Sequence, residues 1–314
     1  MIRRLALLLV LASLVFVSAP KMSATAAEPP VAQPVAAGRP LVLVCMDPLS
    51  APLACDCVQG YAQRKYEKLG EYLSKSLHRP VRIKWSESLV TAIEDVETTQ
   101  GRADLVIGKH SVVMADAAEV KRTFKPIASL TGTDGKTHQT GLIVVRQHDS
   151  AQKLDDLQGY RVFFGPSDCD EKSLAPMTLL KQSGVSLPAK PETYPACSTA
   201  AAALVELDKN VKAAAIISSY AGPLLEGCGT VKKGDLRVIG ESDPVPFVTA
   251  FVSDQLSTDE QAAIKKALLD VGIHVDLLEA LETLDGFVEF KELPPPGSEA
   301  AKKLRATTAT AKKK

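Results

Sequence analysis

The chain has 314 residues, of which 46% are hydrophobic and 24% are charged, with equal numbers of basic and acidic residues. This composition is typical of a globular protein, and the length allows one large or two smaller domains. The charge is unevenly distributed, because residues 301–314 contain only basic charges and residues 28–300 carry 28 basic against 37 acidic residues. An acidic body argues against nucleic acid as a partner.

The first 27 residues have the pattern of a secretory signal peptide. Arg3 and Arg4 precede an apolar run from Leu5 to Ala19, and small residues follow at 24–27. The apolar run is shorter than the ~20 residues of a membrane-spanning helix. We therefore expect export, cleavage of residues 1–27 and no membrane span in the mature chain. The Pro- and Ala-rich residues 28–39 are expected to form a linker.

The hydrophobic pattern from residue 40 onward predicts alternating strands and helices, which is the signature of an α/β fold. The expected strands are 41–44, 81–85, 103–108, 124–130, 140–146, 161–164, 213–217 and 236–239. The expected helices are 59–77, 89–99, 112–120, 168–183, 197–207, 258–271 and 275–283. Ser257 begins a Ser-Thr-Asp-Glu sequence that is favourable at a helix start.

Two segments, near 138–146 and 236–246, are interpreted as crossings between two halves of the molecule. We expect two doubly wound α/β lobes joined by two crossing hinge segments. Residues 40–137 and 236–293 would form the first lobe and residues 138–235 the second. Residues 294–314 begin at a run of prolines and are expected to be a disordered basic tail.

Polar side chains follow several of the predicted strands. Ligands bind outside the carboxyl ends of strands in sheets of this kind, so these loops are candidates for a binding site. They include Asp47 after the first strand, Lys109-His110-Ser111 after the third, and Ser218-Ser219-Tyr220 after the strand at 213–217. The sequence has no G-x-S-x-G, H-E-x-x-H or glycine-rich phosphate motif, so a hydrolase is the least supported class.

Four segments, in order, resemble the phosphate- and phosphonate-type substrate-binding proteins of ABC importers, which have the type 2 periplasmic binding protein fold. They are GRADLVIGKHSVV at 101–113 and the segments 144–168, 211–222 and 236–246. The resemblance covers residues 40–293. It implies a monomeric, non-enzymatic periplasmic protein without a cofactor. Such a protein traps a small polar, anionic ligand between its lobes by hinge closure and passes it to an inner-membrane permease.

The resemblance also implies the ligand-binding positions. These fall at strand ends and at the first crossing: Asp47, Lys109, His110, Ser111, His138, Ser167, Ser198, Thr199, Ser218, Ser219 and Tyr220.

One turn departs from the family pattern. Phosphonate-binding members carry a small, hydroxyl-rich turn after the Phe-Gly pair, whose N–H groups and hydroxyls hold the anion. Here Asp168, Asp170 and Glu171 occupy this turn. They are either helix-capping acids with Ser167 as the N-cap, or acids that face the ligand. The second alternative favours a ligand less charged than phosphate, or one with a cationic part that Asp47 or Asp168 can meet.

Six cysteines in an exported chain favour disulfide bonds. Cys55 and Cys57 cannot readily pair with each other, because their spacing would strain the bond. Candidate pairs are Cys45 with Cys55 or Cys57, and Cys197 with Cys169 or Cys228. One alternative is a copper or zinc site that uses the thiolates of Cys55 and Cys57 with Met46, His110 or His138. Another is a redox role.

Overall fold

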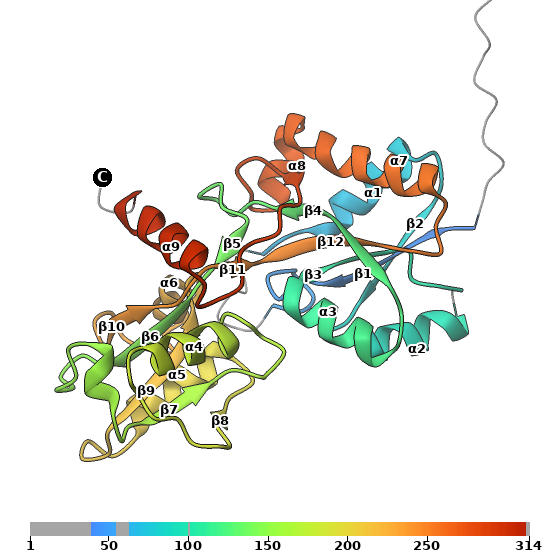
Figure 1. Cartoon of the computed structure of the whole chain (residues 1–314). Helices are drawn as coiled ribbons and strands as arrows, with labels where there is room; N and C mark the ends of the chain where they lie inside the picture. Colours follow the sequence, from blue (N-terminus) through green and yellow to red (C-terminus); the bar gives the residue numbers. More distant parts are fainter. Residues whose placement is uncertain (1–38, 55–62, 100, 312–314) are drawn as a thin grey trace, which may run out of the picture. The chain divides into compact units, whose positions relative to one another are not determined.

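Two large β-sheets with helices on both faces, and a two-stranded sheet, form the described part of the chain (Figure 1). The computed structural model describes residues 39–54, 63–99 and 101–311. The expected signal peptide and nearly all of the expected linker lie outside this range, as do Cys55 and Cys57. The α/β class and the division into two sheets joined by crossing strands confirm the predicted fold.

The first sheet has six strands in the order β13-β4-β12-β3-β1-β2. Their bounds are β1 Leu41–Met46, β2 Val81–Trp85, β3 Leu105–Lys109, β4 Phe124–Leu130, β12 Val248–Ser253 and β13 Phe287–Glu289. Strand β1 pairs in parallel with β2 and β3, and β12 runs antiparallel between β3 and β4. The chain therefore returns to this sheet from its second half, as the two predicted crossings require.

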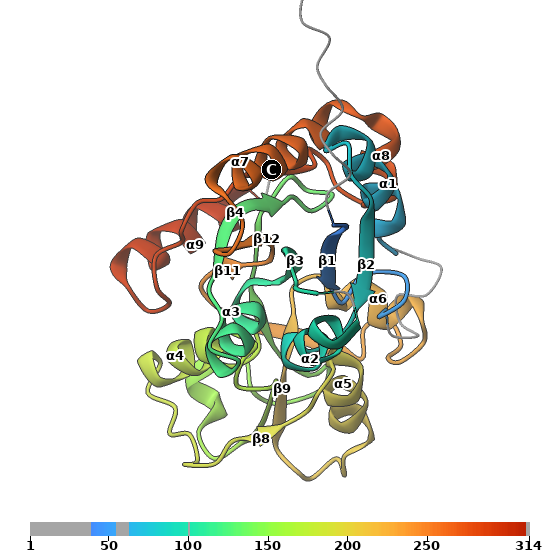
Figure 2. The same ribbon diagram turned by 90° about the vertical axis from the view of Figure 1, so that its right-hand side faces the viewer.

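Helices cover both faces of the first sheet (Figures 1 and 2). One face packs against α1 Tyr66–Ser76, α7 Thr258–Leu269 and α8 Val275–Ala280, and the other against α2 Leu89–Thr99 and α3 His110–Glu119. Alternate residues of β1 serve the two faces: Leu41 and Leu43 belong to the first core, and Val42 and Val44 to the second. A strand buried on both faces must be apolar throughout, which explains its unbroken hydrophobic run.

The second sheet has five strands in the order β10-β6-β9-β7-β8. Their bounds are β6 Gly141–Arg146, β7 Arg161–Phe164, β8 Glu192–Thr193, β9 Ala213–Ser218 and β10 Leu236–Glu241. The helices of this lobe are the 3-10 helix Leu154–Leu157, α4 Leu174–Gln182, α5 Cys197–Glu206 and α6 Ala221–Gly227. Phe164 packs with α4 on one face of this sheet, and Phe163 packs with α5 on the other.

The two crossings meet in a short antiparallel ribbon formed by β5 His138–Gln139 and β11 Val245–Pro246. Strand β10 lies before this ribbon and pairs with β6, so it belongs to the second lobe. Its sequence position had placed it in the first lobe, with residues 236–293, and this assignment was wrong. A hydrophobic pattern identifies a strand but not its sheet, because pairing with β6 depends on contacts far apart in sequence. The return crossing therefore starts after Glu241.

The C-terminal segment also differs from the prediction, because α9 Glu299–Ala311 is a helix and not a disordered tail. Its alanines and lysines have high helix propensity. The backbone N–H of Gly297 donates to Asp243 Oδ2 at 2.8 Å, and Arg305 forms an ion pair with the same carboxylate at 3.2 Å. Asp243 is almost fully buried in the return crossing, so the tail is attached to the hinge region.

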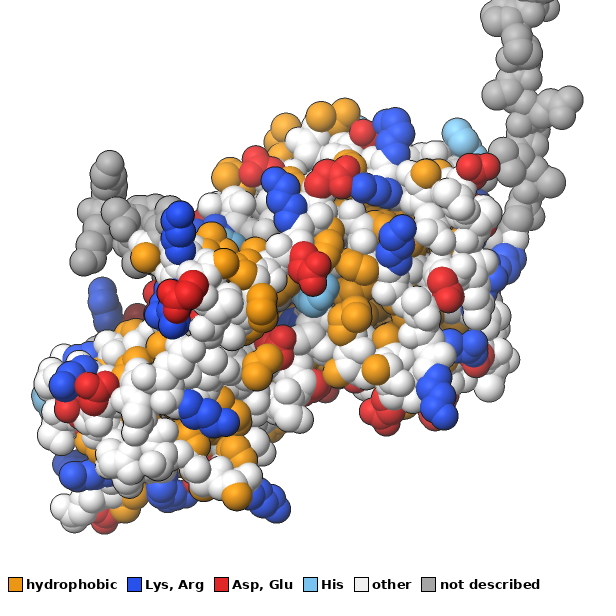
Figure 3. Space-filling view, in the orientation of Figure 1, with side chains coloured by type: hydrophobic (Ala, Val, Ile, Leu, Met, Phe, Trp, Pro, Cys, Tyr) orange, Lys and Arg blue, Asp and Glu red, His pale blue; other side chains and the backbone are white. Residues whose placement is uncertain are grey.

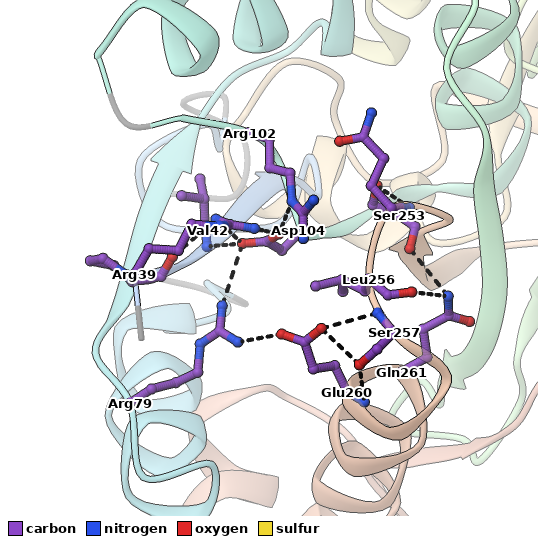
Figure 4. A network of polar contacts seen from close by, with 12 residues as sticks. Arg39, Val42, Arg79, Arg102, Asp104, Ser253, Leu256, Ser257, Glu260 and Gln261 are labelled. Carbon is purple, nitrogen blue, oxygen red and sulfur yellow. Dashed lines mark hydrogen bonds and ion pairs between the residues drawn. The ribbon is translucent and has the colours of Figure 1, made fainter. Parts of the chain in front are cut away.

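A cluster of charged side chains closes the first sheet at the amino ends of β1 and β3. Arg39, Arg79 and Arg102 all point to the buried carboxylate of Asp104 (Figure 4). Asp104 also accepts a hydrogen bond from the backbone N–H of Val42 at 3.0 Å. This cluster lies at the end of the strands opposite to the candidate binding loops, so it supports the fold and leaves the carboxyl ends of β1 and β3 available for a ligand.

Basic and acidic side chains are interspersed over the face of the molecule shown in Figure 3. A mixture of both signs gives no extended basic surface on that face, in agreement with the argument from composition against nucleic acid. Within residues 39–54, 63–99 and 101–311, no helix combines the length and the apolar character needed to span a membrane.

Candidate ligand-binding cleft

A cavity of about 430 Å³ lies where the carboxyl ends of β1, β3 and β7 meet the amino end of α5. We call it the cleft cavity. Both lobes contribute to its lining, which includes Met46, Lys109, Cys169, Lys172, Ser198 and Tyr220. Its volume suits a small molecule. Three of the predicted ligand-binding residues, Lys109, Ser198 and Tyr220, line it.

A buried ion pair joins the two lobes beside this cavity. Lys109 is the last residue of β3 in the first lobe, and its ammonium group contacts the carboxylate of Glu171 in the second lobe. Burial raises the pKa of Glu171, but the charges of Lys109 and Lys172 lower it more, to about 2. Burial lowers the pKa of Lys109, but the charge of Glu171 raises it well above its ordinary value. Both groups are therefore charged at neutral pH.

Further contacts hold the Glu171 carboxylate in place. Ser218 Oγ, at the end of β9, donates to Glu171 Oε1 at 2.9 Å, and Cys169 Sγ lies 3.3 Å from both carboxylate oxygens. Burial, together with the charge of Glu171, raises the pKa of the Cys169 thiol to about 12, so this thiol is protonated at neutral pH. The Lys109 ammonium also lies 6.0 Å from the centre of the Tyr220 ring, within cation–π range.

The sequence had suggested that Glu171 lies in the first turn of a helix capped by Ser167, but the structure shows a turn that precedes the helix. Helix α4 begins at Leu174, with Ser173 at its N-cap position, and Ser167 is exposed and lines a different cavity. Two glycines explain the course of the turn. A Cβ on Gly165 would lie 2.4 Å from Lys172 Cβ, and a Cβ on Gly141 would lie 2.0 Å from the Glu171 carbonyl oxygen. These close approaches place Glu171 beside Gly141, at the start of β6.

Asp47 does not face the cleft. It is fully buried after β1, where Arg64 donates to Oδ2 at 2.8 Å and the Tyr66 hydroxyl donates to the same oxygen at 2.6 Å. Oδ1 accepts from the backbone N–H of Leu49 at 2.9 Å. These partners satisfy the carboxylate, so Asp47 fixes the loop after β1 and the start of α1.

A second cavity, of about 450 Å³, lies beside the crossing strands, and we call it the hinge cavity. His138 and Ser219 line it, and Tyr220 borders both cavities. The Tyr220 ring stacks on Phe247 with ring centres 5.3 Å apart. The predicted site residues are therefore divided between two neighbouring spaces, with Tyr220 in the wall between them.

The remaining predicted site residues have other partners. His110 stacks on Phe290, and burial lowers its pKa. Ser111 Oγ accepts a hydrogen bond from the backbone N–H of Asp170 at 3.2 Å, which is a second polar link between the lobes. Thr199 is exposed at the start of α5, where its hydroxyl bonds the backbone of Ala196.

Among the described cysteines, Cys45, Cys169 and Cys197 carry free thiols, and Cys228 is exposed. The suggested pairs of Cys197 with Cys169 or Cys228 are therefore not formed in this structure. The metal alternative gains no support, because no three His, Cys, Asp or Glu side chains in the described part of the chain are grouped to hold an ion. Pairings or ligands that involve Cys55 and Cys57 lie outside the described residues.

Comparison with known proteins agrees with this architecture. Residues 59–292 match the family described as the periplasmic substrate-binding protein of the phosphonate ABC transporter. This segment holds all of the cleft's second-lobe residues and Lys109. A search of curated proteins found no match.

Solved structures with the same fold include three at low sequence identity. A Xanthomonas citri protein bound to ATP has a TM-score of 0.61 and 16% identity, over 88% of this chain and 99% of that one. The binding component of a Pseudomonas aeruginosa phosphonate transporter has a TM-score of 0.59 and 15% identity, over 81% and 82%. PhnD1 of Prochlorococcus marinus, in complex with methylphosphonate, has a TM-score of 0.57 and 14% identity, over 88% of this chain and 99% of that one. The family match, which covers most of the chain, shows that it belongs to the periplasmic substrate-binding proteins of phosphonate ABC transporters, which bind their substrates and are not enzymes.

Proposed function

We propose that this protein captures a small polar ligand in the cleft cavity, between its two lobes, and delivers it to an ABC permease from the periplasm. The observation that carries the proposal is the position of the cavity. It lies at the carboxyl ends of strands from both sheets, with Lys109 from one lobe and Ser198 from the other in its lining. Ligands of open α/β sheets bind at such strand ends.

The hinge geometry supports capture by closure. Two adjacent crossing strands, β5 and β11, connect the lobes, so a change of a few backbone angles there can open or close the cleft. The polar links of Lys109 to Glu171 and of Asp170 to Ser111 hold the lobes together. Export through a cleaved leader and a monomeric state remain part of this proposal.

The fold itself does not identify the ligand. Structures of this fold are described with ATP and with chloride, both for one Xanthomonas citri protein, and with methylphosphonate for PhnD1, and both proteins have low identity to this one. The sequence-based expectation of an anionic, phosphonate- or phosphate-like ligand therefore depends on the residues of this particular cleft.

A thermal-shift screen of the purified protein against small polar metabolites tests the proposal. A ligand at 100 times its dissociation constant adds ~2.7 kcal/mol of apparent stability. Ser198→Trp should fill the cleft cavity and abolish the shift, whereas Thr133→Trp, a control at the exposed rim of the hinge cavity, should retain it. A shift that persists in Ser198→Trp would place the ligand elsewhere.

A further inference from the structure

The cations of the cleft already have partners within the protein. Lys109 is paired with Glu171, and Lys172 donates to the carbonyl oxygen of Pro195 at 3.3 Å. Three carboxylates belong to the cleft, since Glu87 and Asp168 line it and Glu171 lies behind Lys109. Three carboxylates against two ammonium groups give the cleft a net negative charge, which is unfavourable for a phosphonate or phosphate dianion.

Glu171 occupies the turn where the phosphonate-binding relatives, by the sequence resemblance, carry anion-binding hydroxyls. Its carboxylate receives what a bound anion would receive there: the ammonium of Lys109 from one lobe and the hydroxyl of Ser218 from the other. Glu171 is 1% exposed, and Lys109 is 8% exposed. A ligand anion at Lys109 would have to share the ammonium group with this carboxylate or displace it.

We propose that Glu171 is a resident counter-ion that takes the place of the ligand's anionic group. It thereby excludes phosphonate and phosphate dianions from the cleft, which accepts uncharged or amine-bearing polar ligands instead. This inference rests on the proposed function, since it names the class of ligand for the same cavity. Glu87 and Asp168 at the wall form no ion pair with another described residue, so their carboxylates offer partners for an amine.

Calorimetric titration with methylphosphonate and with inorganic phosphate tests the exclusion. The wild type should show no binding up to about 10 mM, whereas Glu171→Gln and Glu171→Ser, which release Lys109, should bind at least about tenfold more tightly. Adding Lys109→Met to Glu171→Ser should abolish the gain. Asp168→Asn removes the same charge from the cleft wall without releasing Lys109, so it should gain much less than Glu171→Gln.

Three results would overturn the proposal. The first is micromolar binding of methylphosphonate by the wild type, which needs no variant to be folded. The second is failure of folded Glu171→Gln and Glu171→Ser to gain anion binding, and the third is an equal gain in Asp168→Asn. Failure of the proposed function is a separate outcome, because it would appear as a wild type that no compound stabilises in the thermal-shift screen.

Discussion

Replacing Lys109 by methionine tests the ion pair between the lobes. The change keeps an apolar stem of similar length and leaves the Glu171 carboxylate buried without its main counter-ion. Breaking a buried pair in this way typically costs 3–5 kcal/mol of unfolding free energy. The pKa of Glu171 gives a figure of the same order for all of its partners together: a fall from 4.5 to about 2 corresponds to about 3 kcal/mol at neutral pH, with Lys109 contributing more than Lys172. We therefore expect a loss of about 3 kcal/mol.

Urea denaturation of the wild type and Lys109→Met at a series of pH values measures this loss. A carboxylate with a lowered folded-state pKa stabilises the protein fully above its ordinary pKa of 4.5 and loses the effect as pH falls towards 2. In Lys109→Met the folded-state pKa of Glu171 rises, because burial raises it and the Lys109 charge that lowered it is gone, so protonation relieves the buried charge as pH falls. The difference between the two proteins should therefore shrink with falling pH and be smallest near pH 2. The double variant Lys109→Met/Glu171→Gln should recover part of the loss, because it leaves no unpaired charge.

The control is Lys265→Met, which removes the lysine of an exposed ion pair with Glu289. Exposed pairs contribute ~0–1 kcal/mol, so this variant should be nearly as stable as the wild type. The reasoning would be refuted if Lys109→Met cost no more than Lys265→Met, or if its cost did not change between neutral and acidic pH.

Three further predictions concern the rest of the chain. Arg305→Ala should lower the unfolding free energy by about 1–3 kcal/mol in urea denaturation, because Asp243 stays buried with one partner fewer; an unchanged midpoint would show that α9 does not support the hinge. Under native conditions a maleimide reagent, followed by peptide mapping, should modify exposed Cys228 much faster than buried Cys45; equal rates would contradict the packing of β1. Intact mass of the exported protein should place its first residue near Ala27, and a retained leader would contradict export by cleavage.

The strands and helices with strong local patterns were predictable. The pattern located β2 and α2 to the residue, and the Ser257 cap of α7 forms as expected, with Glu260 N donating to Ser257 Oγ at 3.3 Å. These elements depend on hydrophobic periodicity and capping within a few residues, which the sequence displays directly. Strand β10 was recognised as a strand but assigned to the wrong lobe, since its partner β6 is about 90 residues away in the chain.

The candidate site was predicted only in part, for the same reason. Lys109 and Tyr220 follow buried strands, so the rule of strand ends located them at the cleft. Glu171 was noted as an acid in an unusual turn, but its role depends on Lys109, 62 residues away, and no local pattern reveals this pair. Asp47 was expected to bind ligand, but its carboxylate pairs with Arg64 instead. The sequence indicated only that Arg64 lies in a helix, and no local pattern links it to Asp47.

Native mass spectrometry of protein purified from the periplasm tests the central claim that a small ligand is held between the lobes. The wild type and Thr133→Trp should each carry an added small-molecule mass, and Ser198→Trp, with the cleft cavity filled, should lack it. The account would be contradicted if Ser198→Trp retained the added mass while Thr133→Trp lost it, because the ligand would then occupy the hinge cavity and not the cleft.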